Sequence, residues 1–106
     1  MLTTILFNNF DSRQAFIVRA QTKANLVANI AAEIVKHNMS DVCTNDLDTN
    51  EADGIEHAGV ELTYVECYAH FEVSEDGGAN SEHYRNFAEA ATEFAKLVVD
   101  AGYYNS

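Results

Sequence analysis

The stretch SEHYRNFAEAATEFAKLVVDA (residues 81–101) has the clearest secondary-structure pattern in the chain, that of a helix. Its apolar residues recur at spacings of three and four, the period of an amphipathic helix. Asn80 or Ser81 is the expected N-cap of this helix, and Gly102 is expected to end it. The residues that share its apolar face are Tyr84, Phe87, Ala88, Ala91, Phe94, Ala95, Val98 and Ala101.

A second amphipathic helix is predicted upstream, over residues 22–37, with Thr22 as N-cap. Its apolar stripe consists of Leu26, Val27, Ile30, Ala31 and Ile34. Before it, LTTILF (2–7) and QAFIVRA (14–20) are β-branched and aromatic runs on either side of the turn-forming NNFDS. They predict an antiparallel hairpin whose second strand turns Phe16, Val18 and Ala20 toward the core.

Between the two helices, VELTYVECYAHFEV (60–73) is expected to form one long strand. Because side chains along a strand alternate between its two faces, the odd-numbered residues from 63 to 73 are expected to face the core. The even-numbered Leu62, Tyr64, Tyr68 and His70 then lie on the opposite face. Fourteen residues exceed the usual length of a strand, so we expect a bulge or an early break.

These elements give the order β-β-α-β-α and an α+β fold. We expect a two-layer sandwich in which an antiparallel sheet of about three to four strands carries both helices on one face. Residues 1–106 are interpreted as a single domain, with an acidic segment, 41–59, inserted between the first helix and the long strand. Structureless connections of about 20 residues are uncommon, so a short strand or turn is expected around GIEHAG (54–59).

Charge is the most informative property of the composition. The 106 residues carry 17 acids against six Lys and Arg, a net charge of −11. Residues 1–40 have a net charge of +2 and residues 41–106 one of −13. From Asp41 to Glu82 there are twelve acids and no Lys or Arg. This split predicts an electrostatically polar molecule with one strongly negative face.

The segment DLDTNEADGIEHAG (46–59) comes close to a calcium-binding loop. In the frame that begins at Asp46, however, Glu51 occupies the sixth position, where an EF-hand needs glycine, and His57 the twelfth, where it needs glutamate. Shifting the frame so that Gly54 is sixth misplaces the final glutamate by one residue. The segment is therefore interpreted as an acidic surface, and no metal or cofactor is expected.

Zinc and catalytic sites are weakly supported. Cys67 and His70 are close in sequence, but residues three apart on a strand point to opposite faces, and no C-x-x-C pair accompanies them. Cys67 lies in the negative half of the chain, which disfavours a thiolate nucleophile. No glycine-rich phosphate loop is present. We expect a protein that is not an enzyme.

The same charge balance argues against direct binding of nucleic acid or of an anionic membrane, since both need a basic surface. The chain has no apolar run of the roughly 20 residues that span a bilayer. It has no recognisable signal peptide, and its two cysteines fit a reducing compartment. A cytoplasmic protein is expected.

A negative face is suited to a positive partner. We therefore expect a small acidic inhibitor that mimics the charge of nucleic acid and blocks the basic surface of a nucleic-acid-binding host complex. In kind it resembles anti-CRISPR and anti-restriction proteins of phages and mobile elements. The residues expected to bind the partner are Asp46, Asp48, Glu51, Asp53, Glu56, Glu66, Glu72, Glu75 and Asp76.

Other hypotheses remain open from the sequence. The chain is alternatively an adaptor or structural protein that forms a homodimer through an open aromatic sheet face, with Leu62, Tyr64, Tyr68 and His70 as contacts. A metal-binding module is a distant third. Adaptation of a whole proteome to salt would also produce an acidic chain of this kind.

Overall fold

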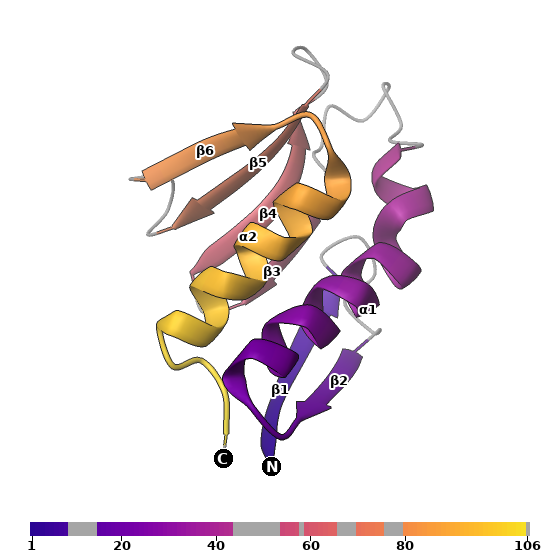
Figure 1. Cartoon of the computed structure of the whole chain (residues 1–106). Helices are drawn as coiled ribbons and strands as arrows, with labels where there is room; N and C mark the ends of the chain where they lie inside the picture. The colour runs from indigo at the N-terminus through magenta and orange to yellow at the C-terminus, as the bar shows by residue number, and fades with distance from the viewer. Residues whose placement is uncertain (9–14, 44–53, 58, 66–69, 76–79, 106) are drawn as a thin grey trace.

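The computed structural model describes residues 1–8, 15–43, 54–57, 59–65, 70–75 and 80–105. These residues form two helices and six strands (Figure 1). In chain order they are β1 (Leu2–Asn8), β2 (Ala15–Ala20), α1 (Lys23–Cys43), β3 (Gly54–His57), β4 (Val60–Val65), β5 (His70–Glu75), β6 (Asn80–Tyr84) and α2 (Phe87–Asp100). The α+β class is confirmed, and the predicted order β-β-α-β-α fits roughly, because extra strands lie between the two helices.

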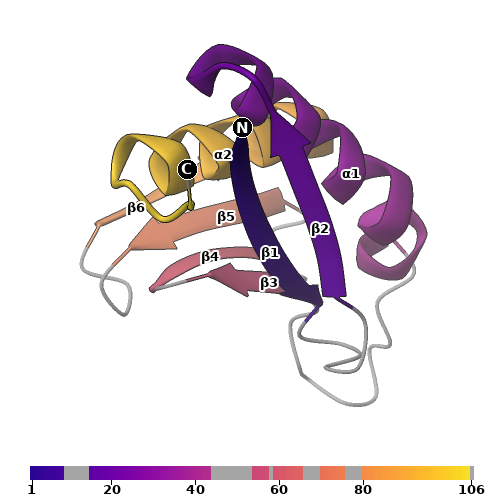
Figure 2. The ribbon, with the colours of Figure 1, turned by 90° about the horizontal axis from the view of Figure 1, so that it is seen from below.

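The strands pair in the order β2-β1-β3-β4-β5-β6, and all neighbours are antiparallel. The prediction of three to four strands is wrong. Among the described residues, two pairs join β1 and β3, namely Phe7 with Glu56 and Asn8 with Ile55. The strands therefore divide into a hairpin, β1–β2, and a four-stranded group, β3–β6, joined by a narrow seam, so the simple single-sheet sandwich is not confirmed. Figure 2 shows β1 and β2 running steeply across the direction of the other strands, with both helices on the same side.

The N-terminal hairpin is the element that the sequence predicted best. In β2 the side chains of Phe16, Val18 and Ala20 are buried, as expected, while Ile17 and Arg19 between them are exposed. β-Branched residues favour this extended, half-buried conformation because their restricted χ1 suits a pleated surface.

One continuous strand over residues 60–73 is not formed, and the expected early break is confirmed, because the chain forms two antiparallel strands there, β4 and β5. Leu62 pairs with Val73, and opposite residues of an antiparallel pair share one face. The core-facing positions are therefore even-numbered in β4 and odd-numbered in β5. Leu62 is 1% exposed, so its predicted place on an open face is wrong, whereas Phe71 and Val73 are buried as predicted.

The helix boundaries also differ from the prediction. α2 begins at Phe87 rather than near Ser81, because Asn86 is the N-cap and its Oδ1 accepts a hydrogen bond from the backbone N of Glu89 at 3.1 Å. Residues 80–84, which were assigned to the helix, form β6. Gly102, with φ +82°, follows the helix end as expected.

α1 extends to Cys43, past the predicted end. Oγ1 of Thr22 accepts a hydrogen bond from the backbone N of Asn25 at 3.1 Å, which confirms Thr22 as the N-cap of α1.

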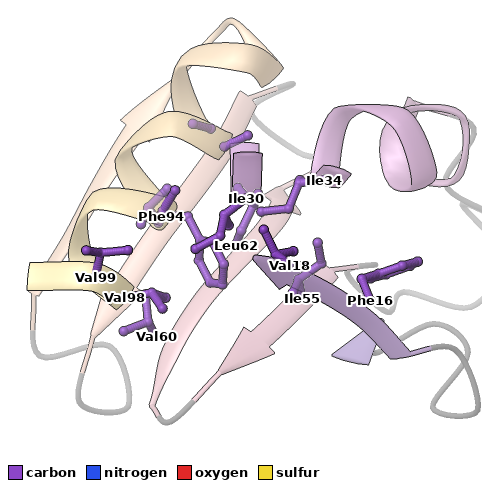
Figure 3. Packing of buried hydrophobic residues seen from close by; sticks show 14 of the residues in the cluster. Phe16, Val18, Ile30, Ile34, Ile55, Val60, Leu62, Phe94, Val98 and Val99 are labelled. Carbon is purple, nitrogen blue, oxygen red and sulfur yellow. The ribbon is translucent and has the colours of Figure 1, made fainter. Parts of the chain in front are cut away.

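The core lies between the helices and the strands (Figure 3). α1 packs against β2 and α2, while α2 packs against β4 and β5. Phe94 of α2 is fully buried, as are Leu26, Ile30 and Ile34 of α1, which were predicted to form its stripe. Each such side chain contributes about 1.5–3 kcal/mol through removal of apolar surface from water.

The C-terminal tail contacts β1 and β3 near the seam. Thr3 and Asn105 exchange two backbone hydrogen bonds of 2.7 Å. The Oγ1 of the buried Thr4 donates to the carbonyl oxygen of Tyr103 at 3.0 Å, and Nε2 of His57 lies 3.0 Å from the same oxygen. A carbonyl only accepts hydrogen bonds, so Nε2 of His57 carries a proton. The tail thus ties β1 and β3 together beyond their short ladder.

Candidate functional site

Described carboxylates gather where β5, β6 and α2 meet. Glu82 pairs with Val73 and Asn80 with Glu75, so Glu75 and Glu82 lie diagonally on the same face of the β5–β6 ladder. Such diagonal positions are separated by roughly 7–8 Å. Glu93 of α2 lies at the same place on the side of the helices, since it lines the same two hollows as Tyr84.

These side chains border a groove of about 370 Å³, which we name the acidic groove. Its apolar part is formed by Val73, which is buried, and Leu97, which packs against the core. The volume lies within the range of small-molecule and side-chain sites. The lining residues are Val73, Glu75, Ser81, Glu82, Tyr84, Glu93 and Leu97.

Tyr84 is the polar centre of the acidic groove. Its hydroxyl donates a hydrogen bond of 2.8 Å to Oε2 of Glu82. Burial is the largest cause that raises the pKa of Tyr84 from 10.0 to about 12, followed by the hydrogen bond to Glu82. The negative charges of Glu93 and Glu89 act in the same direction, because they disfavour a nearby phenolate. Tyr84 therefore remains a neutral donor at all physiological pH values.

A second hollow of about 420 Å³ continues from the acidic groove along α2. It shares Tyr84 and Glu93 with the groove and adds Glu89 together with the cation Lys96. Glu89 and Glu93 are four residues apart on the helix, which places them about 6 Å apart along its axis. The acidic surface thus extends from the edge of the strands onto the helix.

The predicted site residues do not all lie on this surface. Glu75 borders the acidic groove, but Glu72, three residues earlier on the same strand, lies on the opposite face. Oε2 of Glu72 is 3.5 Å from Nε2 of His83, an ion pair when His83 is protonated. Glu72 and Glu75 therefore lie on opposite faces of β5, and their binding of a partner stays a prediction.

Most of the remaining predicted partner-binding residues lie outside the described residues. These are Asp46, Asp48, Glu51, Asp53, Glu66 and Asp76. For Glu56 the structure gives the backbone position alone, in β3, where it pairs with Phe7 and Glu61. The expected strand around GIEHAG is confirmed by β3, which is followed by a turn with Gly59 at φ +91°.

The predicted self-association surface is not assembled as expected. Leu62 is a core residue, and Tyr68 lies outside the described residues. Tyr64 pairs with Phe71, which places its backbone position on the core side of β4. His70 is half-buried, and its ring stacks on that of His83 with centroids 4.2 Å apart and planes at 26°.

Sequence reasoning missed the role of Tyr84 and assigned Glu82 to the last helix rather than to a strand. Two signals were present in the sequence. Asn86 followed three residues later by Glu89 is a capping pattern, which starts the helix at Phe87. Once residues 80–84 are read as a strand, Glu82 and Tyr84 fall on one face because they are two residues apart.

Within the described part of the chain, no group of three or more His, Cys, Asp or Glu side chains is placed to hold a metal ion. Neither described helix combines the length and the apolar character needed to cross a membrane. Comparison of the chain with protein-family models, with curated proteins and with solved structures finds no match.

Proposed function

We propose that this chain is a small, non-catalytic, acidic inhibitor that binds the basic nucleic-acid-binding surface of a host protein in the cytoplasm. It acts by charge mimicry, in the manner of anti-CRISPR and anti-restriction proteins of phages and mobile elements. The observation that supports this most is the acidic groove: Glu75, Glu82 and Glu93 converge on one surface at an edge of the molecule.

Geometry makes this surface a reasonable substitute for a phosphate backbone. Carboxylates about 6–8 Å apart on the ladder and the helix are separated by about two of the 3.4 Å steps by which phosphates advance along one strand. Unlike the phosphates of free nucleic acid, these charges are fixed on strands and a helix. A fixed array loses less conformational entropy when it binds.

Electrostatics then sets the binding behaviour. A net charge of −11 with an uneven distribution attracts a basic groove over long range and raises the association rate. The attraction weakens as salt screens it, since the Debye length shortens from about 10 Å at 0.1 M to about 3 Å at 1 M. The neutral Tyr84 adds a ring face to which a partner's arginine can bind.

The test is affinity capture of host proteins at low and high salt, followed by mass spectrometry and by competition with DNA or RNA. We expect a nucleic-acid-binding protein that is captured at low salt, released at high salt and displaced by its own nucleic acid. If capture at low salt recovers no protein of that class, the proposal is wrong.

A matched pair of variants separates the acidic groove from net charge alone. Glu82→Lys and Asp100→Lys both replace an exposed acid and both change the net charge by two units. We expect Glu82→Lys to weaken binding by about tenfold or more and Asp100→Lys by much less. Equal losses would mean that only the total charge matters, as in a chain that is acidic through adaptation to salt.

A further inference from the structure

The face of the strands opposite α1 and α2, which we name the outer face, is covered by neither described helix (Figure 2). In the hairpin it carries the residues that alternate with the buried Thr4 and Val18, namely Ile5, Ile17 and Arg19. In β4 and β5 it carries the residues that alternate with the buried Leu62 and Val73. These are Glu61, Thr63, His70, Glu72 and the small Ser74, which is buried between its neighbours.

The hairpin part of the outer face is apolar. Ile5 and Ile17 are directly opposite in the β1–β2 register, so their side chains are neighbours. They remain 42% and 53% exposed. Among the described residues four large hydrophobic side chains are exposed, and this pair accounts for two of them. An exposed, adjacent pair of isoleucines on a sheet is a natural contact for another surface.

Charge on the outer face has opposite signs at its two ends. Arg19 follows Ile17 by two residues and is exposed on the same face. Glu61 pairs with Ser74 and Thr63 pairs with Glu72, so Glu61 and Glu72 lie diagonally on the outer face of β4–β5. The hairpin end is therefore positive and the β4–β5 end negative.

We infer that a second copy of this chain covers the outer face, related by a two-fold axis over the middle of the strands. The hairpin of each copy lies on β4–β5 of the other, so that Arg19 meets Glu61 twice and the isoleucine pair is removed from water twice. In a two-fold dimer the positive end of each copy meets the negative end of the other, so both contacts join opposite charges. A second copy thus satisfies both patches at once.

Long-range repulsion between two chains of net charge −11 opposes this dimer. Salt near 0.15 M limits it, since the Debye length is then about 8 Å, while oppositely charged groups in direct contact are screened less. The dimer is therefore expected to be tighter at moderate salt than at very low salt. The acidic groove lies on the helix side and remains open in the dimer, so this inference is independent of the proposed function.

Sedimentation equilibrium in about 0.15 M salt tests the inference. We expect wild-type protein to have twice the chain mass of 11.7 kDa. Arg19→Glu and Glu61→Lys should each raise the dissociation constant of the dimer by about tenfold for each of its two contacts. Mixing these two variants in equal amounts should restore a dimer, because both contacts of the mixed species again join opposite charges.

Two controls on α2 change the net charge equally without touching the outer face: Lys96→Glu matches Arg19→Glu, and Glu89→Lys matches Glu61→Lys. Both controls should remain dimeric, and circular dichroism should show all four variants folded. Wild-type protein that is monomeric up to about 0.1 mM would overturn the inference. A dimer that both outer-face variants leave intact would also overturn it. The same holds if the controls weaken the dimer as much as the outer-face variants do, or if mixing Arg19→Glu with Glu61→Lys does not restore a dimer.

Discussion

Leu62→Ala is the substitution that tests the strand register most directly. Leu62 is 1% exposed and packs between the strands and the helices (Figure 3). Removing such a side chain loses its transfer free energy and leaves a cavity that the neighbours fill only in part, at a cost of about 2–5 kcal/mol. For a domain near this length, about 1 kcal/mol lowers Tm by roughly 4–8 °C, so we expect a fall of at least about 8 °C.

The matched control is Thr63→Ala, at the next residue of the same strand. Thr63 is half-buried and lies on the outer face, so its replacement should cost less than about 1 kcal/mol, mainly through lower β-propensity. Urea denaturation of both variants, followed by circular dichroism, gives the free energies of unfolding, and an unchanged m-value shows that the unfolding transition is comparable.

The result that would refute this reasoning is equal destabilisation by the two substitutions, or a larger effect of Thr63→Ala. A shift of one residue in the β4–β5 pairing moves every side chain to the opposite face. Such a result would therefore show that Leu62 lies on the outer face, as the pattern of a single long strand had predicted.

Two further predictions concern the acidic groove and the helix beside it. Because its native pKa is raised from 10.0 to about 12, Tyr84 keeps a proton that the unfolded chain has lost, so stability should fall between pH 10 and 12. Tyr84→Phe should remove this component of the pH dependence. Burial, the largest cause of the raised pKa, remains in Glu82→Gln, but loss of the Glu82 carboxylate should lower the pKa of Tyr84, as measured by tyrosinate absorbance. An unchanged pKa in Glu82→Gln would contradict the contribution assigned to Glu82. Asn86→Ala should cost about 0.5–2 kcal/mol in chemical denaturation because the N-cap is lost, while Ser81→Ala should stay within about 0.5 kcal/mol. A larger cost for Ser81→Ala than for Asn86→Ala would mean that the helix begins near Ser81.

Local patterns in the sequence predicted the elements whose structure depends on neighbours in the chain. The period of three and four residues identified both helices, with Thr22 as the correct cap of α1. The alternation of Phe16, Val18 and Ala20 gave the buried face of β2. In these cases the side chains that determine the element lie within one or two turns or within one strand, so a short window contains the relevant information.

Prediction failed where one pattern fits two structures. Residues 60–73 alternate well enough for a single strand, and only the pairing of Leu62 with Val73 shows that the chain folds back. Folding back reverses the predicted faces in β4 alone, which places Leu62 in the core, while the odd-numbered Phe71 and Val73 of β5 face the core as predicted. The predicted partner-binding residues had been chosen for the regional excess of negative charge, and charge along the sequence does not show on which face of a strand each residue lies.

By itself, the sequence determined the α+β class, the N-terminal hairpin, the apolar faces of the helices and the concentration of negative charge after residue 40. Composition and local periodicity are properties of neighbouring residues, and they do not depend on how distant segments meet. Tertiary structure alone decided that Tyr84 of β6 donates to Glu82 beside Glu93 of α2, and that Ile5 and Ile17 are exposed together with Arg19. Those groupings depend on strand register and on the side from which the helices pack, and both are fixed by long-range contacts.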